Sequence, residues 1–339
     1  MVQIILLLKT ISLKIKIDCL FMYKKILITG GAGFVGANLV RRLFAAGYEV
    51  EVADNLSRGF IEYLPNADMF QQGDIRDKSF LNTVMADVEA VIHLAAYGSV
   101  VESVSDPYPN FDINAFGTFN VLDAARQANV KKFLFASTGG ALIGDAEPPV
   151  DESSLPKPIS PYGSSKLCGE AYCHSFAKAY GLNTVCLRFA NVYGPYSAHK
   201  KGAVTKFMKC LLDGSPIPIF GDGAASRDFL HVDDLCFGIQ KTLEADNEPG
   251  SVFHLASAKE ISILDLAKTI CKVAGDTEHP IDYLDKRPGE VARNFARYDK
   301  AKKELGFEPS IDLEKGIEST WHWFVEHKDE VLNINETDS

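Results

Sequence analysis

An apolar run leads directly into a turn that holds four glycines within residues 24–36, KKILITGGAGFVG. Three of them, Gly30, Gly33 and Gly36, are spaced three residues apart. Glycine allows a tight turn, a close approach of a phosphate to the main chain and close packing of the next helix on the strand. The N-terminus of that helix adds free N–H groups and a partial positive charge. The segment therefore predicts a strand, a phosphate-binding turn and a helix, the opening unit of a parallel α/β sheet.

Beyond this unit, short apolar runs alternate with segments of helical spacing, as a parallel α/β sheet requires. With 24–30 as the first strand, we expect further strands at 48–55, 67–75, 89–96, 131–138 and 183–194, and helices at 37–47, 114–128 and 160–181. Residues 250–257 are expected to return to the same sheet. The predicted fold class is α/β: a Rossmann-type doubly wound parallel sheet with a smaller C-terminal α/β substrate-binding lobe.

The second predicted strand ends in Asp54, which lies 24 residues after Gly30 (54 − 30). A carboxylate at this spacing accepts hydrogen bonds from the adenosine ribose of a dinucleotide and repels the extra phosphate of NADP. The predicted cofactor is therefore NAD, and Arg58 is the one nearby feature that favours NADP. The pattern places cofactor contacts at Gly30, Gly33, Phe34, Val35, Gly36, Asp54 and Asn55, and at Asp74 and Ile75 beside the adenine.

The composition excludes several classes of function. A net charge of −10 leaves no basic field for nucleic acid or for a membrane surface. The seven cysteines are odd in number and form no Cys-x-x-Cys, so we expect no metal site and no disulfide framework. A reducing cytoplasm is the expected location.

The first 21 residues are apolar, but they include Lys9, Lys14, Lys16 and Asp18. This charge makes them unsuited to span a membrane. We expect residues 1–21 to be an N-terminal extension outside the fold, with Met22 as the natural start. A weak membrane anchor is the alternative.

A tyrosine and a lysine lie four residues apart in Tyr162-Gly-Ser-Ser-Lys166, so a helix places them on one face. An unperturbed tyrosine has a pKa of about 10, too high for a base at neutral pH. We expect the Lys166 ammonium and the positive nicotinamide ring to favour the phenolate and to lower this pKa. The fifth strand ends upstream in Ser137-Thr138, whose hydroxyls are expected at the carboxyl edge of the sheet.

Together these segments resemble the extended short-chain dehydrogenases/reductases of the NAD-dependent epimerase/dehydratase family, and within it the UDP-glucose 4-epimerases. The resemblance covers about residues 24–325. It rests on TGGAGFVG, DNL, GDIRD, HLAA, ESV, NAFGT, STGGA, SPYGSSK, RFANVYGP, FGDG, SRDFLHVDD, RPGE and a closing GIESTWHWF, in the expected order.

The resemblance implies roles for individual residues. Tyr162 and Lys166 match the catalytic base and its helper, and Thr138 matches the hydroxyl donor of a subset of the family. A gap-free alignment places the usual catalytic serine on Gly139, one residue later. Gly98 stands where many members carry a lysine near the cofactor, so this chain must neutralise that region otherwise. Further cofactor contacts are implied at Leu94, Ala95, Ala96, Asn114, Tyr162, Lys166 and Phe189. Substrate contacts are implied at Thr138, Tyr162, Asn191, Val204, Ile219, Arg227, Arg287 and Glu290.

The implied mechanism is oxidation followed by reduction. Tyr162 removes the proton of the sugar 4-hydroxyl while the C4 hydride passes to NAD, and the 4-keto sugar takes it back on the opposite face. Related 4,6-dehydratases need an acid after the active-site threonine, typically Asp-Glu, and the decarboxylases carry a glutamate there. Here the position is Gly139-Gly140, which favours a UDP-hexose 4-epimerase over both.

Fewer residues bear on the identity of the sugar than on the type of reaction. Asn294 aligns with a bulky tyrosine that restricts some epimerases, so it is expected to admit UDP-N-acetylhexosamines as well as UDP-glucose and UDP-galactose. UDP-glucuronate is an alternative, with His199, Lys200 and Lys201 as partners for its carboxylate, although a solvated loop is the favoured interpretation of these three. A non-enzymatic sensor of NAD or of a nucleotide sugar is the alternative from another class.

We expect an NAD-binding domain over 22–193, with 229–256 returning to it. A nucleotide-sugar-binding lobe is expected over 194–228 and 257–330, with a frayed tail over 331–339. The resemblance also implies a homodimer formed through the helices around 112–126 and 162–180.

Overall fold

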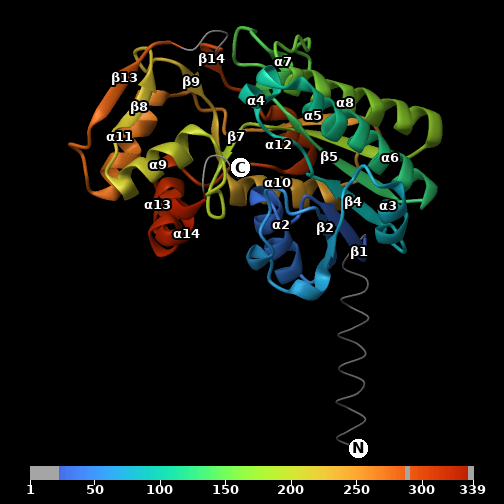
Figure 1. Ribbon diagram of the computed structural model, residues 1–339. Coiled ribbons are helices and arrows are strands. Elements are labelled where there is room, and N and C mark those ends of the chain that lie inside the picture. The colour runs from blue at the N-terminus through green and yellow to red at the C-terminus, as the bar shows by residue number, and fades with distance from the viewer. Residues whose placement is uncertain (1–22, 287–290, 335–339) are drawn as a thin grey trace, which may run out of the picture.

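Residues 23–286 and 291–334 are described by a computed structural model of the chain (Figure 1). The predictions for residues 1–21, for Arg287 and for Glu290 lie outside the described residues. The centre of the molecule is a seven-stranded sheet in the order β11-β6-β5-β4-β1-β2-β3, with every neighbouring pair parallel. Its strands are β1 (Lys25–Thr29), β2 (Glu49–Asp54), β3 (Phe70–Gln72), β4 (Ala90–His93), β5 (Lys132–Thr138), β6 (Asn183–Phe189) and β11 (Ser251–Leu255).

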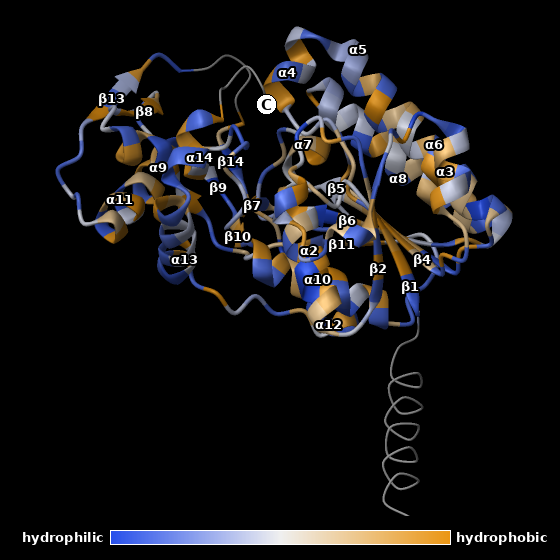
Figure 2. Cartoon of the chain, turned by 60° about the horizontal axis from the view of Figure 1, so that its bottom comes forward, coloured by the Kyte–Doolittle hydropathy of each residue, from blue (hydrophilic) through white to orange (hydrophobic). Residues whose placement is uncertain are grey.

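Helices cover both faces of this sheet (Figure 1), and the central strands β1 and β4 are mostly apolar (Figure 2). One face carries α2 (Phe34–Ala45), α10 (Val232–Glu244) and α12 (Asp299–Leu305), and the other carries α3 (Lys78–Val84), α6 (Thr118–Gln127) and α8 (Pro161–Tyr180). Along β1, Ile26 and Ile28 enter the first core while Leu27 enters the second. This arrangement confirms the predicted Rossmann-type α/β fold, because a parallel sheet needs both faces covered.

The strand order reverses between β1 and β4. In open α/β sheets the crevice at the carboxyl ends of such a pair is where ligands bind. The glycine-rich turn after β1 and the segment after β4 both open at this point, and β5 ends beside them. The topology therefore brings the predicted cofactor and catalytic segments to one edge.

A smaller lobe stands beside this edge and has a core of its own (Figure 1). Its helices are α9 (Ala203–Asp213), α11 (Ile263–Ala274), α13 (Leu313–Glu326) and α14 (Lys328–Asn333), and its strands are β8 (Ile217–Phe220), β9 (Ser226–Arg227), β12 (Ile261–Ser262), β13 (Ile281–Leu284) and β14 (Arg293–Asn294). Two strands, β7 (Asn191–Tyr193) and β10 (Phe229–His231), pair with each other rather than with the large sheet. Val331 is fully buried in α14, so this helix runs past the expected start of the tail at 331.

Most of the predicted strands and helices are confirmed, and the differences have local causes. The helix expected at 114–128 begins earlier, as α5 (Pro107–Asn110) and a π-helical segment η3 (Phe111–Gly117), because Asp106 caps Pro107. The third strand is shorter than expected because Asn66 caps a 3₁₀ turn, η2 (Ala67–Met69). Three short helices complete the fold: η1 (Ile61–Tyr63), α4 (Val100–Ser105) and α7 (Gly140–Ile143).

Candidate active site at the carboxyl edge of the sheet

The turn between β1 and α2 has a geometry that only glycine satisfies. Gly30 has a φ of +72°, and a Cβ on it would lie 2.6 Å from the backbone nitrogen of Ala95. A Cβ on Gly36 would lie 2.3 Å from the carbonyl oxygen of Gly30. Gly33 is the N-cap residue of α2, and no side chain among the described residues forms a capping hydrogen bond at this end of the helix. The turn is therefore a main-chain cradle that fits the diphosphate of NAD, with Phe34 and Val35 supplying the next N–H groups.

The end of β2 holds the predicted ribose-binding carboxylate. Asp54 accepts hydrogen bonds from the backbone nitrogens of Ala32 (3.1 Å) and Leu56 (2.8 Å), and burial raises the pKa of its carboxyl. These two bonds tie Asp54 to the glycine-rich turn. Each of its oxygens still has a lone pair, so the carboxylate can accept from the ribose hydroxyls.

The predicted adenine contacts lie beside it. Asn55 donates to Asp74 at 3.1 Å, and Arg76 holds the pKa of Asp74 at about 2. Ile75 is buried, and a Cβ on Gly117 would meet its Cδ1 at 2.6 Å. Leu94, Ala95 and Ala96 are half-buried and follow β4. These residues border the same crevice.

Arg58 does not have the freedom that the NADP alternative requires. Its guanidinium lies 2.8 Å from Glu102 and 4.2 Å from the ring centroid of Tyr97. Glu102 also accepts from Lys201 at 2.7 Å, so one carboxylate of α4 joins the loop after β2 to the segment before α9. We call Arg58, Glu102 and Lys201 the Glu102 bridge. Burial alone would raise the pKa of Glu102, but the bonds from Lys201 and Arg58 outweigh it and hold the pKa at about 2.

The prediction that residues 199–201 form a solvated loop is wrong for two of the three. Lys200 is half-buried, donates to the Val192 carbonyl at 2.9 Å and lies 5.1 Å from the ring centroid of Phe34. Burial lowers the pKa of Lys200 to about 8 and that of His199 to about 4. Since Lys201 is already paired with Glu102, none of the three is a freely available partner for a sugar carboxylate.

The Tyr162-Lys166 pair opens helix α8, as predicted. Ser160 caps the helix through its hydroxyl, and the Tyr162 N–H donates to the Ser103 hydroxyl at 3.1 Å. Lys166 donates to the Ala136 carbonyl at 2.8 Å, and its nitrogen lies 5.9 Å from the ring centroid of Tyr162. The two side chains therefore share one face of the helix and point to the end of β5.

The expected lowering of the Tyr162 pKa is not found in the protein alone. Burial raises the pKa of Tyr162 to about 12 and lowers that of Lys166 to about 8. A nearby cation favours the phenolate, but burial removes water from both groups and disfavours both charged forms, and in the protein alone this desolvation dominates.

Thr138 is the last residue of β5 and is half-buried opposite Phe189, the last residue of β6. Its neighbour Ser137 points the other way, into a buried hydrogen bond with Glu170 at 2.6 Å. A Cβ on Gly139 would lie 3.3 Å from Nδ1 of His254, inside the fully buried surroundings of that ring. A side chain at position 139 would therefore face the interior. This geometry favours Thr138, and not position 139, as the hydroxyl-bearing residue of the site.

Asn114 lies between these parts rather than at an open surface. Its amide accepts from the Tyr97 backbone nitrogen at 2.7 Å and donates to the Tyr97 carbonyl at 3.1 Å and to Ser165 at 3.2 Å. It is 1% exposed, which leaves little of the side chain for a direct contact with a ligand. Asn114 therefore positions the segment after β4 against α8.

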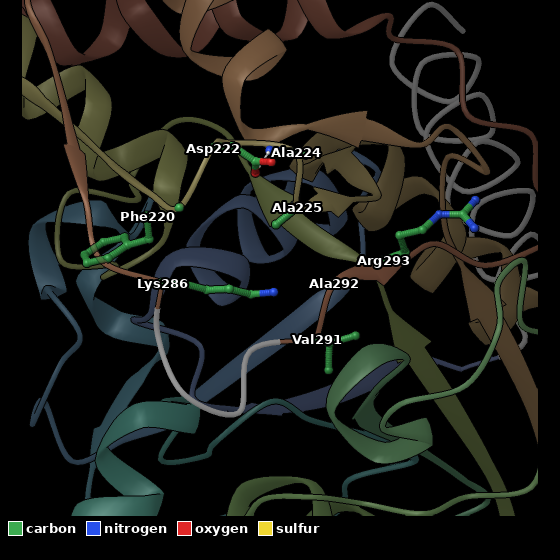
Figure 3. A pocket seen from close by; sticks show the side chains of 9 residues that line it. Phe220, Asp222, Ala224, Ala225, Lys286, Val291, Ala292 and Arg293 are labelled. Atoms are coloured by element: carbon green, nitrogen blue, oxygen red, sulfur yellow. Dashed lines mark hydrogen bonds between the residues drawn. The ribbon is translucent and has the colours of Figure 1, made fainter.

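A cavity of about 540 Å³ opens in the smaller lobe (Figure 3). Figure 3 shows Lys286 extending toward its middle and Arg293 directed away. Arg293 is instead paired with Glu260 at 2.7 Å and with Glu147 at 2.9 Å. The lining residues are Phe220, Gly221, Asp222, Ala224, Ala225, Lys286, Val291, Ala292 and Arg293. An aromatic ring and a lysine in one cavity suit a base and a phosphate group.

The remaining predicted substrate residues are two polar residues on short strands and two apolar residues in the core of the lobe. Asn191 is exposed at the start of β7, and its amide donates to the Asp228 carbonyl at 3.2 Å. Arg227 is half-buried in β9, where it donates to the Ser226 carbonyl at 2.7 Å. Val204 and Ile219 are buried in the core of the lobe, so their side chains support the site from behind.

Among the described residues, no group of three or more His, Cys, Asp or Glu side chains is arranged to hold a metal ion. No helix in the described ranges is long and apolar enough to cross a membrane.

Sequence reasoning missed four charged or titratable residues that surround the site. Glu102 joins two loops, and Glu170, Arg188 and His254 lie together beneath Thr138. The available signal was a charged residue inside an apolar strand, as Arg188 is in TVCLRF. Such a residue is buried only if it finds a partner, and the partner cannot be identified from spacing.

Comparison with known proteins agrees with this geometry. The family model described as the NAD dependent epimerase/dehydratase family matches residues 26–256. The crystal structure of a UDP-glucose 4-epimerase with UDP-glucose, from Thermotoga maritima, is 36% identical, with a TM-score of 0.86 over 90% of this chain and 99% of that one. A UDP-N-acetylglucosamine 4-epimerase from Methanobrevibacter ruminantium is 32% identical, with a TM-score of 0.85 over 90% and 99%. A dTDP-glucose 4,6-dehydratase from Streptomyces niveus is 32% identical over 90% of this chain and 94% of its own length.

Proposed function

The chain belongs to the NAD-dependent epimerase/dehydratase family, and from that premise we propose that it inverts C4 of a UDP-hexose through a transient 4-keto sugar. The observation that carries the proposal is the grouping of Tyr162, Lys166 and Thr138 at one edge of the sheet, without a carboxylate at the next two positions. An elimination or a decarboxylation would need an acid there. Epimerisation needs only a base, a hydroxyl donor and room for the sugar to turn.

When bound, NAD supplies the acceptor and then the donor of the C4 hydride. Tyr162, as the phenolate that Lys166 stabilises, takes the proton of the 4-hydroxyl and becomes a neutral phenol, while Lys166 is held in place by the Ala136 carbonyl. Thr138 donates a hydrogen bond to the same sugar oxygen, which becomes a carbonyl. Tyr162 then returns its proton to the same oxygen, as the C4 hydride comes back on the opposite face of the ring.

The sugar ring can turn over without being lost only if the protein binds the rest of the substrate tightly. We assign the uridine diphosphate to the cavity of the smaller lobe, where Phe220 faces the base and Lys286 meets a phosphate. Binding energy spent on the nucleotide leaves the hexose free to present either face. Arg227 and Asn191, on the path from this cavity to Thr138, are proposed to contact the diphosphate.

We further propose that the sugar pocket accepts N-acetylated hexoses. Asn294 contacts the turn after Thr138, since a Cβ on Gly140 would lie 2.4 Å from its amide nitrogen. A tyrosine at this position would fill space beside the sugar. UDP-glucuronate is less favoured, because Lys200 and Lys201 already have partners within the protein.

The assembly is proposed to be a homodimer. Large apolar side chains are exposed on α4, α5, η3 and α8: Val101, Val104, Tyr108, Phe111, Phe116, Tyr172 and Tyr180. Phe116, Tyr172 and Tyr180 lie in the ranges expected at the interface, around 112–126 and 162–180, and the other four precede the first of these ranges. Exposed large apolar side chains gathered on neighbouring helices are typical of an interaction surface.

The test is direct. Purified protein is denatured to look for released NAD, and the native protein is incubated with UDP-glucose, UDP-N-acetylglucosamine and UDP-glucuronate before sugar analysis. We expect NAD to be released and the first two sugars to be converted to their 4-epimers, with activity lost in Tyr162→Phe. Retained NAD without conversion of any sugar would favour the sensor alternative.

A further inference from the structure

A buried ion pair joins helix α8 to strand β6 beneath the proposed active site. Arg188 donates from Nε to one oxygen of Glu170 (2.9 Å) and from Nη2 to the other (2.8 Å), and the side chains are 5% and 8% exposed. The Ser137 hydroxyl donates to the same carboxylate at 2.6 Å. Replacing a buried ion pair by apolar residues is often neutral or stabilising, so stability alone gives no reason for this one.

The pair sits in register with the Tyr162-Lys166 pair. Glu170 follows Lys166 by four residues and Tyr162 by eight, so all three lie along one face of α8. Lys166 donates a hydrogen bond to the carbonyl of Ala136, and Glu170 accepts one from the hydroxyl of Ser137. One face of α8 therefore carries the proposed base and two side chains that are hydrogen-bonded to β5.

The same strand end is also fixed from its other side. The Gly139 N–H donates to the Phe189 carbonyl at 3.0 Å, and Phe189 directly follows Arg188. Thr138 thus stands between Ser137, which is bound to the ion pair, and Gly139, which is bound to the strand of Arg188. The position of the Thr138 hydroxyl relative to Tyr162 depends on these bonds.

Among the described residues, Glu170 is the carboxylate that forms an ion pair with Arg188. Its register partner His254 is fully buried, and burial together with the Arg188 charge lowers the pKa of this imidazole to about 3. The neighbouring ring is therefore neutral, and Glu170 alone balances the guanidinium. Removing only Glu170 would leave a buried unpaired cation.

We propose that Glu170 and Arg188 are positioning residues of the active site, which hold Thr138 at a fixed place relative to Tyr162 through Ser137. The inference rests on the proposed function. The ion pair lies behind the residues proposed to contact the substrate, and Glu170 follows Tyr162 by two helical turns on α8. Misplacement of a reacting group by about 1 Å can lower a rate a hundredfold. Loss of the bonds that position Thr138 is therefore expected to lower kcat.

The decisive variant removes both charges together. Glu170→Gln with Arg188→Met leaves no buried unpaired charge, so it is expected to fold and to retain NAD. We expect KM for the UDP-sugar within threefold of the wild-type value and kcat lowered about a hundredfold. The pH profile of kcat should keep its shape, because Tyr162 and Lys166 stay on one helix and Lys166 keeps its bond to the Ala136 carbonyl. Ser137→Ala, which keeps the ion pair, should lower kcat by about tenfold.

The matched control removes an exposed ion pair from the same helix. Lys178 and Glu248 lie 3.8 Å apart at the surface, and Lys178→Met with Glu248→Gln should leave kcat and the pH profile unchanged. A Glu170/Arg188 double variant with kcat within threefold of wild type would overturn the positioning role while the proposed function stands. A wild-type chain that converts none of the UDP-sugars would overturn the proposed function, and this inference with it.

Discussion

Lys132 offers a quantitative test of how the large sheet is held to helix α10. It is the first residue of β5 and is fully buried, a costly place for an ammonium. Its nitrogen donates to the carbonyls of Thr242 (2.6 Å), Leu243 (3.3 Å) and Ala245 (2.6 Å) and to the side chain of Asn247 (2.8 Å). The lysine therefore caps the C-terminus of α10, whose last carbonyls have no partner within the helix.

Lys132→Met keeps the apolar stem and removes the ammonium. Each hydrogen bond to a charged group contributes about 1.5–3 kcal/mol, but the four share one cation and do not add. The variant leaves no unpaired charge, but it leaves buried carbonyl acceptors without a donor, which costs about 1–3 kcal/mol for each group that finds no new partner. We therefore expect a loss of about 4 kcal/mol in the free energy of unfolding. At about 2 °C per kcal/mol for a chain of this size, Tm should fall by about 8 °C.

The assay is urea unfolding followed by tryptophan fluorescence, with the NAD content of each sample matched. Lys131→Met is the control, since Lys131 is the preceding residue and forms only an exposed ion pair with Glu89. That variant should lose less than about 1 kcal/mol. Equal losses in the two variants, or a loss below about 1 kcal/mol for Lys132→Met, would refute the account of Lys132 as a buried cap.

Three further predictions concern the site and the assembly. Asp54→Asn should lower the amount of NAD retained on purification and reduce the preference for NAD over NADP by about tenfold, measured by titration of the cofactor-free protein. Glu102→Gln should speed NAD release, followed by dilution into a coupled assay, because the bridge between Arg58 and Lys201 then loses its charge. Since the pKa of Glu102 is held at about 2, the stability from the bridge is present above about pH 4.5 and is lost as the pH falls toward 2, so wild type and Glu102→Gln should converge in urea midpoint only near about pH 2. Phe116→Glu should give a monomer in light scattering, and a dimer of unchanged affinity would place the interface elsewhere.

Local patterns were enough to predict the frame of the site. The glycine spacing, Asp54 at the end of a strand, and Tyr162 one turn before Lys166 all depend on residues close in sequence. Alternating apolar runs predicted the strands for the same reason. These features follow from backbone geometry and periodicity, which a single sequence contains.

The parts that escaped prediction depend on pairs that are distant in sequence. Lys132 meets Asn247, 115 residues away, and Glu102 meets Lys201, 99 residues away. A lysine next to an apolar strand indicates that some partner exists, but spacing cannot say which one. The direction of the Tyr162 pKa was missed because it depends on burial, and the extent of burial is a property of the packed molecule.

The two glycines after Thr138 have a structural role as well as a chemical one. A Cβ on Gly139 would lie 3.3 Å from the His254 ring, and one on Gly140 would lie 2.4 Å from the Asn294 amide. A carboxylate at Gly139 would be forced against a buried neutral imidazole, where its charge is disfavoured. At Gly140 the main obstacle is Asn294 itself, which has to move before any side chain can enter.

The residues proposed to determine which reaction occurs therefore come from segments that lie far apart in the chain. Thr138 and the glycines come from β5 and the turn after it, His254 from β11 and Asn294 from β14. Introducing an acid at Gly140 should first require a smaller residue in place of Asn294, and that same change would enlarge the space beside the sugar. Asn294, which is proposed to determine which hexose fits, thus also leaves no room for an acid beside the sugar. A change at Asn294 is therefore expected to alter both the sugar that is accepted and the reaction that follows oxidation at C4.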